Sequence, residues 1–206
     1  MTQLRPQNVA AASVRTAEGV AVARRPAGGG RWLPGRLLAL GALVWLCVAA
    51  WPVAANAEAR ASALRPLERS VLSEMNGLRR QHGLVRLRFS AGLAAAARHH
   101  STEMANRGYF RHNSASGEAF SRRIARFYPI GTRRYWSVGE NLLWSSVELN
   151  AAAALDLWLN SPEHRAIMLN ARWLEVGVGA VYAHAAPGAY GGRNVTIVTA
   201  DFGVRR

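Results

Sequence analysis

The 206-residue sequence contains no lysine, a single cysteine and few acidic side chains. All 26 basic residues are Arg, and only 12 residues are Asp or Glu, so the formal net charge is +14. Because Cys47 has no second cysteine to pair with, an intramolecular disulfide is excluded. The chain that follows residue 57 also lacks a thiol nucleophile. Its stability must come from a hydrophobic core, and about 140 residues can bury ~65–70% of their unfolded surface without cross-links.

The positive charge lies on both sides of residue 57. Residues 1–57 hold six Arg and one acid, and residues 58–206 hold 20 Arg and 11 acids. A domain with this excess is attracted to anionic surfaces, and salt screens the attraction. Charge alone does not distinguish phospholipid head groups, anionic wall polymers and nucleic acid.

The N-terminal part of the sequence has the pattern of an export signal. Four Arg residues between positions 24 and 36 precede an apolar run from Leu37 to Ala50, and Pro52 follows that run. Ala55-Asn56-Ala57 then forms a small-residue cleavage site before Glu58. The alternative is an uncleaved anchor, because residues 37–55 carry no charge and are just long enough to span a bilayer. In both cases the positive flank stays inside and residue 58 onward is exported.

The exported part is expected to be a short linker, 58–65, and one domain, 66–206. Helical spacing of apolar residues, with Pro66 at a first turn and Gly83 as a stop, predicts the first helix. Ser90 as N-cap and Gly108 as terminator predict a second helix. Further helices are expected over 117–127, from a Ser146 cap through 160, and from Ser161-Pro162 to 169. Strands are expected over 138–143, 176–182 and 195–201, with a flexible hairpin loop over 183–194.

Three residues in separate segments are candidates for a functional site. His112 lies in a loop beside aromatics, and His164 lies in the first turn of a short helix, where the helix dipole disfavours a charged ring. Glu140 stands near the start of an apolar strand, and if it is buried it needs a partner. Two histidines and a carboxylate could hold Zn²⁺ with a water as fourth ligand. They could also form a proton-transfer site. The alternatives are that His112 is a loop histidine without a functional role, that Glu140 is exposed or paired to an Arg, and that His164 has only a local packing role.

Five short stretches, in this order and spacing, carry a resemblance to a known family. They are Tyr109-Phe110-Arg111-His112, Gly139-Glu140-Asn141-Leu142, residues 158–165, Val176-Gly177-Val178-Gly179 and Asp201-Phe202-Gly203. From about Leu67 to Gly203 the chain resembles the CAP superfamily (cysteine-rich secretory, antigen 5 and pathogenesis-related proteins), in its bacterial secreted form. The resemblance implies an α/β fold, an α/β/α sandwich in which helices flank a small antiparallel sheet. Eukaryotic members are usually disulfide-bonded, and this chain departs from them.

The resemblance also implies a central cleft lined by two histidines and two glutamates. His112, Glu140 and His164 match three of those positions, and Asn141 and Ser161 are expected to lie along the same cleft. Ser161 stands where the family has its second glutamate, and the nearby Glu163 is offset from that position. The missing acid weakens a metal site, so His112 and His164 are candidate ligands for Zn²⁺ with an incomplete set.

These observations predict a secreted or envelope-associated module that binds a lipid or a cell-envelope component. The alternative is a metal-assisted hydrolase in which Glu140 acts as base and His112 and His164 position a metal or the substrate. No Gly-x-Ser-x-Gly elbow and no two-histidine metalloprotease motif is present. A monomer is expected, and because the domain is exported no nucleic-acid partner is expected.

One segment has no counterpart in the resemblance. Residues 119–139 contain five Arg and no acid, and Phe127, Tyr128, Tyr135 and Trp136 are interleaved with them. The segment is interpreted either as a solvated loop or as a contact for an anionic surface, in which Arg holds phosphates and aromatic rings enter the interface. The five are Arg122, Arg123, Arg126, Arg133 and Arg134.

Overall fold

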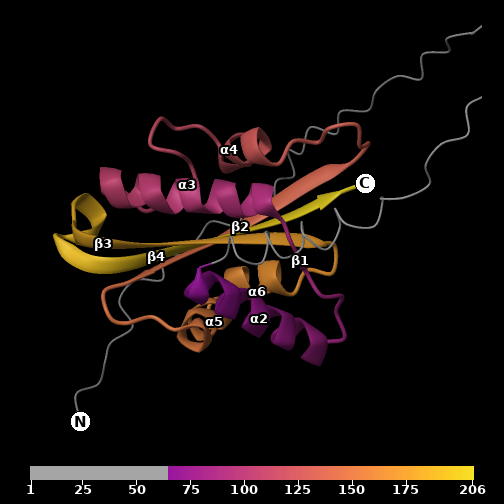
Figure 1. Cartoon of the computed structure of the whole chain (residues 1–206), viewed down its shortest axis with the longest axis horizontal. Helices are drawn as coiled ribbons and strands as arrows, with labels where there is room; N and C mark the ends of the chain where they lie inside the picture. The colour runs from indigo at the N-terminus through magenta and orange to yellow at the C-terminus, as the bar shows by residue number, and fades with distance from the viewer. Residues whose placement is uncertain (1–64) are drawn as a thin grey trace, which may run out of the picture.

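A four-stranded sheet lies between two layers of helices in the computed structural model, which describes residues 65–206 (Figure 1). Helices α3 and α4 cover one face of the sheet, and α2, α5 and α6 cover the other (Figure 1). The expected α/β/α sandwich is therefore confirmed. The elements are α2 (Pro66–Gln81), β1 (Arg88–Phe89), α3 (Ala91–Arg107), α4 (Phe120–Phe127), β2 (Trp136–Ser145), α5 (Ala151–Leu159), α6 (Pro162–Met168), β3 (Glu175–Ala186), a 3₁₀ turn η1 (Gly188–Tyr190) and β4 (Arg193–Arg205).

The strand order is β1-β3-β4-β2, so β2 is an edge strand. Strands β3 and β4, and β4 and β2, pair antiparallel, whereas the two-residue β1 pairs parallel with β3 and was not predicted from the sequence. The predicted signal or anchor segment lies outside the described residues, as does nearly all of the linker. Within residues 65–206, no helix has the length and apolar character needed to cross a bilayer.

The clearest helix signals in the sequence were correct. Helix α2 begins at Pro66. Helix α3 follows Ser90, whose hydroxyl accepts the amide hydrogen of Leu93, and ends at Gly108 in the left-handed conformation. A side-chain acceptor at the N-cap and a residue without Cβ at the terminus satisfy the otherwise unpaired backbone groups of a helix.

Three predictions about local structure were wrong. Helix α5 is capped by Asn150, which accepts the amide hydrogen of Ala153, and not by Ser146. Helix α4 begins at Phe120, three residues later than expected. Much of the segment 183–194 is strand and not loop, because β3 continues to Ala186 and β4 starts at Arg193. The register shift lies before the turn, between Ala183 and Ala186, where Ala185 has a positive φ, and the strands pair again at Ala186 and Arg193.

Two glycines on β3 allow helix α3 to lie against the sheet. A Cβ placed on Gly177 would lie 1.9 Å from the amide nitrogen of Ala94, and one on Gly179 would lie 2.2 Å from that of Arg98. The helix backbone therefore occupies the space that side chains would fill. On the opposite face the sheet packs against bulky side chains, among them Met75, Trp158 and Met168.

Candidate functional site

Glu140 lies on β2, on the face of the sheet that α3 and α4 cover. Its neighbours at positions 138 and 142 belong to the cores on that face, and the strand alternates faces at every residue. One carboxylate oxygen contacts Nδ1 of His112 at 2.7 Å, and the other forms an ion pair with the guanidinium of Arg123, which comes from α4. Arg123 also donates to the carbonyl oxygen of His112 at 2.7 Å. The two charged groups are almost completely buried and are paired with each other.

The ion pair decides the charge state of Glu140. Burial by itself raises the pKa of this carboxyl. The Arg123 guanidinium, together with His100 and His112, outweighs burial and lowers the pKa of Glu140 to about 2. Glu140 is therefore a carboxylate at all physiological pH values. A base with so little proton affinity and with both oxygens engaged is poorly suited to abstract a proton from water.

A second buried carboxyl faces Glu140 across the strand pair. Asp201 on β4 is the Cα partner of Glu140 and also of Gly177 on β3, and its exposed fraction is zero. Neither oxygen of Asp201 receives a hydrogen bond within the described residues. Burial and the negative charge of Glu140 raise the pKa of Asp201 well above the usual range. The raised pKa favours the protonated form of Asp201, which can donate its hydrogen to Glu140.

His164 lies on the other side of β2. It is in the first turn of α6, and Asn141, the residue after Glu140 and so on the opposite face of the strand, donates its side-chain amide to the His164 carbonyl oxygen at 3.0 Å. The imidazole is fully buried, and neither ring nitrogen has a hydrogen-bond partner within residues 65–206. Burial, with a smaller contribution from the charge of His112, lowers the pKa of His164 to about 4, so the ring is neutral.

The structure joins some of the predicted residues directly and others less closely. His112 and Glu140 are hydrogen-bonded, and Asn141 fixes the backbone at His164. His164 makes no hydrogen bond to His112 or Glu140, although the charge of His112 acts on its ring. Ser161 occupies the N-cap position of α6 without a side-chain cap bond, and Glu163 is exposed to solvent. Glu140 and Asn141 thus lie on opposite faces of the edge strand β2, with His112 bonded to Glu140 on one face and the backbone of His164 bonded to Asn141 on the other.

Three buried residues of this region were not predicted as site residues. Arg123 was assigned to an Arg-rich surface, and that assignment is wrong because its side chain is fully buried against Glu140. Asp201 was considered only as the end of a strand. His100 is fully buried, with its Nε2 2.9 Å from the carbonyl oxygen of Arg111. Burial lowers the pKa of His100 to about 4.

A signal for Arg123 was present in the sequence. An apolar strand that carries one carboxylate requires a counter-charge if that carboxylate is buried. Arg123 stands one residue before Ile124, on the inward face of a short amphipathic helix. Its position on that face distinguishes it from the neighbouring arginines of the same segment.

The donor set does not suit a catalytic zinc ion. Such a site needs three protein ligands in addition to water. The Nδ1 atom of His112 is occupied by Glu140, and no group of three or more His, Cys, Asp or Glu side chains within residues 65–206 is placed to hold a metal. His112 and His164 offer two imidazoles at most, in agreement with the missing second glutamate.

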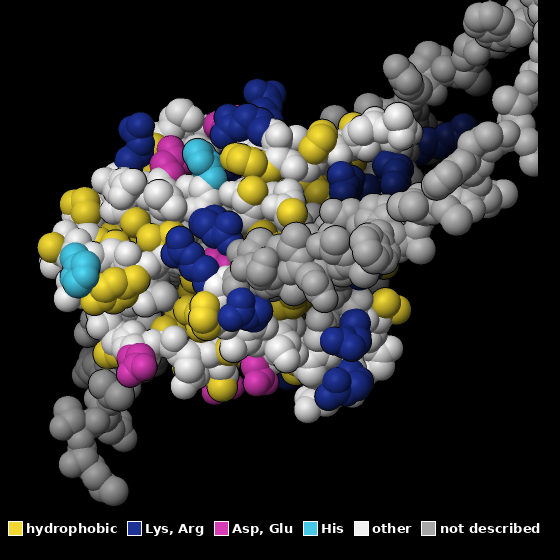
Figure 2. All heavy atoms as spheres, in the orientation of Figure 1, with side chains coloured by type: hydrophobic (Ala, Val, Ile, Leu, Met, Phe, Trp, Pro, Cys, Tyr) yellow, Lys and Arg dark blue, Asp and Glu magenta, His cyan; other side chains and the backbone are white. Residues whose placement is uncertain are grey.

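The rest of the Arg-rich segment is on the surface, and its aromatic residues are not. Arg122, Arg126, Arg133 and Arg134 are exposed, whereas the four aromatic residues between positions 127 and 136 are buried or half-buried. Figure 2 shows Arg side chains along the top, across the centre and on the right of the face in view. The segment therefore offers charge to an anionic surface but no aromatic rings for insertion.

Comparisons with known proteins agree with this architecture. A family model described as "Cysteine-rich secretory protein family" (CAP) matches residues 72–202. The chain is 32% identical over 112 residues to the uncharacterized membrane protein YlbC of Bacillus subtilis (strain 168), covering 54% of this chain and 31% of YlbC. It is 29% identical over 121 residues to the uncharacterized protein YkwD of the same organism, covering 58% of this chain and 44% of YkwD.

A solved structure is similar over much of the described region. It is an extracellular protein containing an SCP domain from Bacillus anthracis str. Ames, with a TM-score of 0.53 and 25% identity, and the match covers 69% of this chain and 44% of that one. The chain thus spans less than half the length of each of these three relatives. The matched family model covers more than half of the sequence, so this chain belongs to the cysteine-rich secretory protein (CAP) family.

Proposed function

We propose that this chain is an exported module that binds a lipid or another cell-envelope component at the free edge of β2. The observation that supports this most strongly is a group of buried polar atoms without hydrogen-bond partners in residues 65–206. They are Nε2 of His112, both ring nitrogens of His164 and Oδ1 of Asn141. Native proteins pair almost all such atoms, so an unpaired group concentrated at one place indicates a site that is completed by a polar ligand.

The protonation states suggest what the ligand presents to the site. A neutral imidazole has one donor and one acceptor nitrogen, and the Asn141 oxygen accepts. A group that both donates and accepts, such as a hydroxyl, an amide or a protonated phosphate of a head group or polymer unit, matches this set. The interaction does not need a net charge on the ligand, because Glu140 is already compensated by Arg123.

Location at the cell envelope is supported by sequence and by similarity. The N-terminal segment has the pattern of an export signal, and one relative of known structure is described as extracellular. The exposed Arg side chains would then attract the domain to anionic lipids or polymers at low salt. This attraction is distinct from binding at the β2 edge, because charge pairing on an exposed surface is screened by salt.

The alternative function, a metal-assisted hydrolase with Glu140 as base, has less support. Both oxygens of Glu140 are engaged and its pKa is lowered to about 2. The ligand set for a metal within residues 65–206 is also short. Binding is therefore the function that we favour for this site.

The test is cosedimentation of the full-length protein with phosphatidylglycerol vesicles and, separately, with insoluble peptidoglycan in the presence of excess soluble N-acetylglucosamine tetrasaccharide, at low and at high salt. We expect one of the two to retain the protein at high salt. His112→Gln should remove this salt-resistant fraction, whereas His82→Gln, which changes an exposed histidine, should leave it unchanged. Equal retention of both variants at high salt would contradict a site at the β2 edge. Binding that disappears with salt for every variant would reduce the interaction to surface charge.

A further inference from the structure

A second candidate site lies at the end of the sheet where β2 finishes and β4 begins. A groove of about 350 Å³ is lined by residues 145–149 together with Tyr182, Asn194 and Thr196. Tyr182, Thr196 and Ser145 are Cα partners across β3, β4 and β2, so they form one row on the face that also packs α2 and α5. The loop before α5 forms the opposite wall. A groove of this size falls within the range of small-ligand sites.

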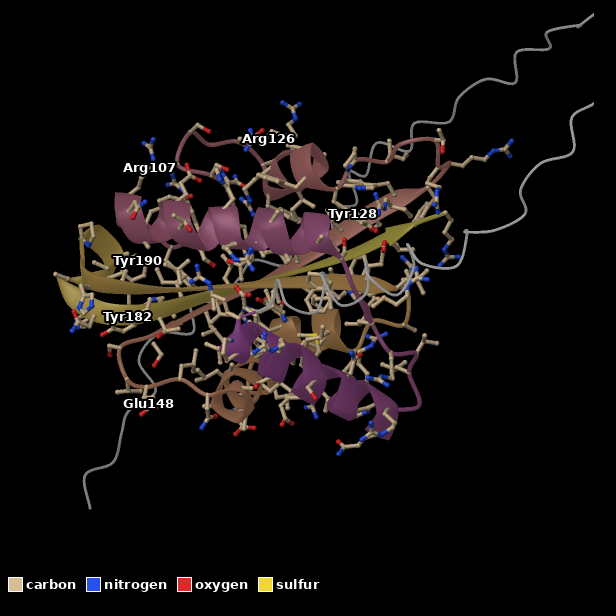
Figure 3. All side chains as sticks on the ribbon, viewed as in Figure 1. Arg107, Arg126, Tyr128, Glu148, Tyr182 and Tyr190 are labelled. Atoms are coloured by element: carbon tan, nitrogen blue, oxygen red, sulfur yellow. The ribbon has the colours of Figure 1, made fainter. Side chains whose placement is uncertain are left out.

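Exposed apolar side chains gather at this groove. Tyr182 is 58% exposed and Val147 is 55% exposed, and the third large exposed hydrophobic residue of the described chain, Val85, is elsewhere. The Tyr182 ring packs edge-on against the imidazole of His184, with centroids 4.9 Å apart and an interplanar angle of 86°. This contact supports the ring from one side. Figure 3 shows Tyr182 and Glu148 at the same end of the molecule.

The polar groups of the groove are arranged for hydrogen bonding to a ligand. Ser145 is satisfied internally, because its hydroxyl bonds to both the amide and the carbonyl of Val147 and so fixes the loop. The oxygen of the Asn194 side chain accepts from the amide of Ala185, which directs the NH₂ group elsewhere. Asn194, Thr196 and Glu148 thus line the same groove as the exposed ring of Tyr182.

The groove has no arginine in its lining, although the chain has 26. In the view of Figure 2, hydrophobic side chains and a histidine gather at the left-hand end, where the β3–β4 hairpin lies, and Arg side chains are drawn mainly above it and towards the right. A phosphate or carboxylate ligand would be selected by arginine. A groove that lacks arginine and contains Glu148 selects against anions and favours a neutral ligand rich in hydroxyl groups.

We propose that the groove formed by Tyr182, Glu148, Asn194 and Thr196 binds a neutral saccharide. A sugar ring has an apolar face of C–H groups and a rim of hydroxyls. Tyr182 would stack on the apolar face, because an aromatic ring supplies a large flat contact with little entropy to lose. The Glu148 carboxylate would accept hydrogen bonds from hydroxyls of the rim, and the Asn194 amide would donate to a ring or acetamido oxygen. The site is separate from the β2 edge at His112 and does not depend on it.

Titration of the full-length protein with soluble tetrasaccharides of N-acetylglucosamine and of glucose, followed by NMR chemical shifts or calorimetry, tests the proposal. We expect saturable binding in the millimolar range or tighter. Tyr182→Ala should weaken it by about tenfold, and Tyr182→Phe should retain it because stacking does not need the hydroxyl. Glu148→Gln should weaken it by about threefold, because a charged acceptor makes stronger hydrogen bonds than a neutral one.

Two control variants distinguish binding in this groove from binding elsewhere on the domain. Val85→Ala removes an exposed apolar residue outside the groove and should leave saccharide binding unchanged. His112→Gln should also leave it unchanged, so failure of the β2-edge site and failure of this groove give different results. Absence of saturable binding by both tetrasaccharides would overturn the proposal. Equal affinity of the wild type and Tyr182→Ala, or binding of an unrelated apolar peptide with the same dependence on Tyr182, would overturn it as well.

Discussion

Glu140 and His164, on opposite faces of the sheet, respond to burial in opposite ways. On the α3/α4 face, Glu140 remains charged because Arg123 pairs with it, whereas burial and the negative charge of Glu140 raise the pKa of Asp201. On the α2/α5/α6 face, His164 is buried without a partner for its ring within residues 65–206 and is held neutral. A buried charge persists where another element supplies its counter-charge, and a titratable group without one loses its charge.

Among the substitutions that test this contrast, Arg123→Met should have the largest effect on stability. The substitution removes the cation and leaves the buried carboxyl of Glu140 without its counter-charge, facing Asp201. Breaking a buried pair in this way costs about 3–5 kcal/mol. We expect the midpoint of urea denaturation to fall accordingly. Arg126→Met, on the same helix but exposed, should change stability by less than about 0.5 kcal/mol.

The double variant Arg123→Met/Glu140→Gln decides whether charge or packing is responsible. It removes both charges, so it should recover much of the lost stability. If the double variant is as unstable as Arg123→Met, the guanidinium acts through packing and hydrogen bonds to the backbone, and the contrast between the two faces does not rest on charge.

Gly177→Ala should have the next largest effect, and it tests how closely α3 approaches the α3/α4 face of the sheet. The added Cβ would lie 1.9 Å from the amide nitrogen of Ala94 and 2.2 Å from the carbonyl carbon of Leu93. Because both are backbone atoms, no side-chain rotation relieves the collision, and helix and strand must separate. Overpacking of this kind costs about 1–3 kcal/mol or more. Thermal denaturation should show a clear fall in Tm.

The matched control for this substitution is Gly77→Ala in α2, on the other face of the sheet. A Cβ at Gly77 meets nothing within 4 Å. Replacing a glycine inside a helix by alanine stabilises the protein by roughly 0.5–1 kcal/mol. Thermal denaturation of both variants should therefore give shifts of opposite sign. A shift of the same sign in both would show that α3 is not seated on the glycines of β3.

Much of the fold could be predicted from the sequence, because its signals are local. Ser90 and Gly108 mark the ends of α3 through backbone groups that any helix must satisfy, and the glycines of β3 indicate close packing through the absence of side chains. The cap of α5 could not be chosen by the same reasoning. Ser146 and Asn150 are both good N-cap residues, and the choice depends on where β2 ends, which the pairing with β4 determines.

The candidate site was predictable only in part, for a related reason. His112, Glu140 and His164 were identified by motif, and the partner of Glu140 was not. The pairing of Arg123 with Glu140 depends on how α4 packs over β2, and a sequence shows Arg123 only as one of several arginines in a basic segment. Asp201 became part of the site through strand register, which places it opposite Glu140.

His164 predicts a pH dependence of stability with a definite sign. Its pKa is near 6.5 in the unfolded chain and about 4 in the folded protein, so the unfolded state binds the proton more readily. The contribution of His164 to the free energy of unfolding is complete above pH 6.5. As the pH falls towards 4, roughly 2–3 kcal/mol of that stability is lost. His100 acts in the same direction. We expect His164→Gln to reduce the fall in Tm between pH 7 and pH 4.5 by about half.

For His164→Gln the informative quantity is the change of Tm with pH. The absolute Tm is less informative, because the substitution also changes packing. His82→Gln, at an exposed position, should retain the slope of the wild type. An unchanged slope in His164→Gln would mean that this imidazole is accessible to protons in the folded protein, and the contrast with the compensated charge at Glu140 would be lost.

Asp201→Asn should have the smallest effect and the opposite sign. The pKa of this acid is raised in the folded state, so the folded protein holds a proton that the unfolded chain releases above pH 4, and stability decreases as the pH rises. An asparagine does not titrate, so it removes this loss of stability at high pH, and its NH₂ group can still donate to Glu140. We expect a gain in stability at pH 7 that declines towards pH 4. Denaturation of Asp201→Asn and of the exposed control Asp156→Asn across this range measures it. A gain that does not vary with pH would place the ionised form of Asp201 in the folded protein, and Arg123 would then compensate two carboxylates at once.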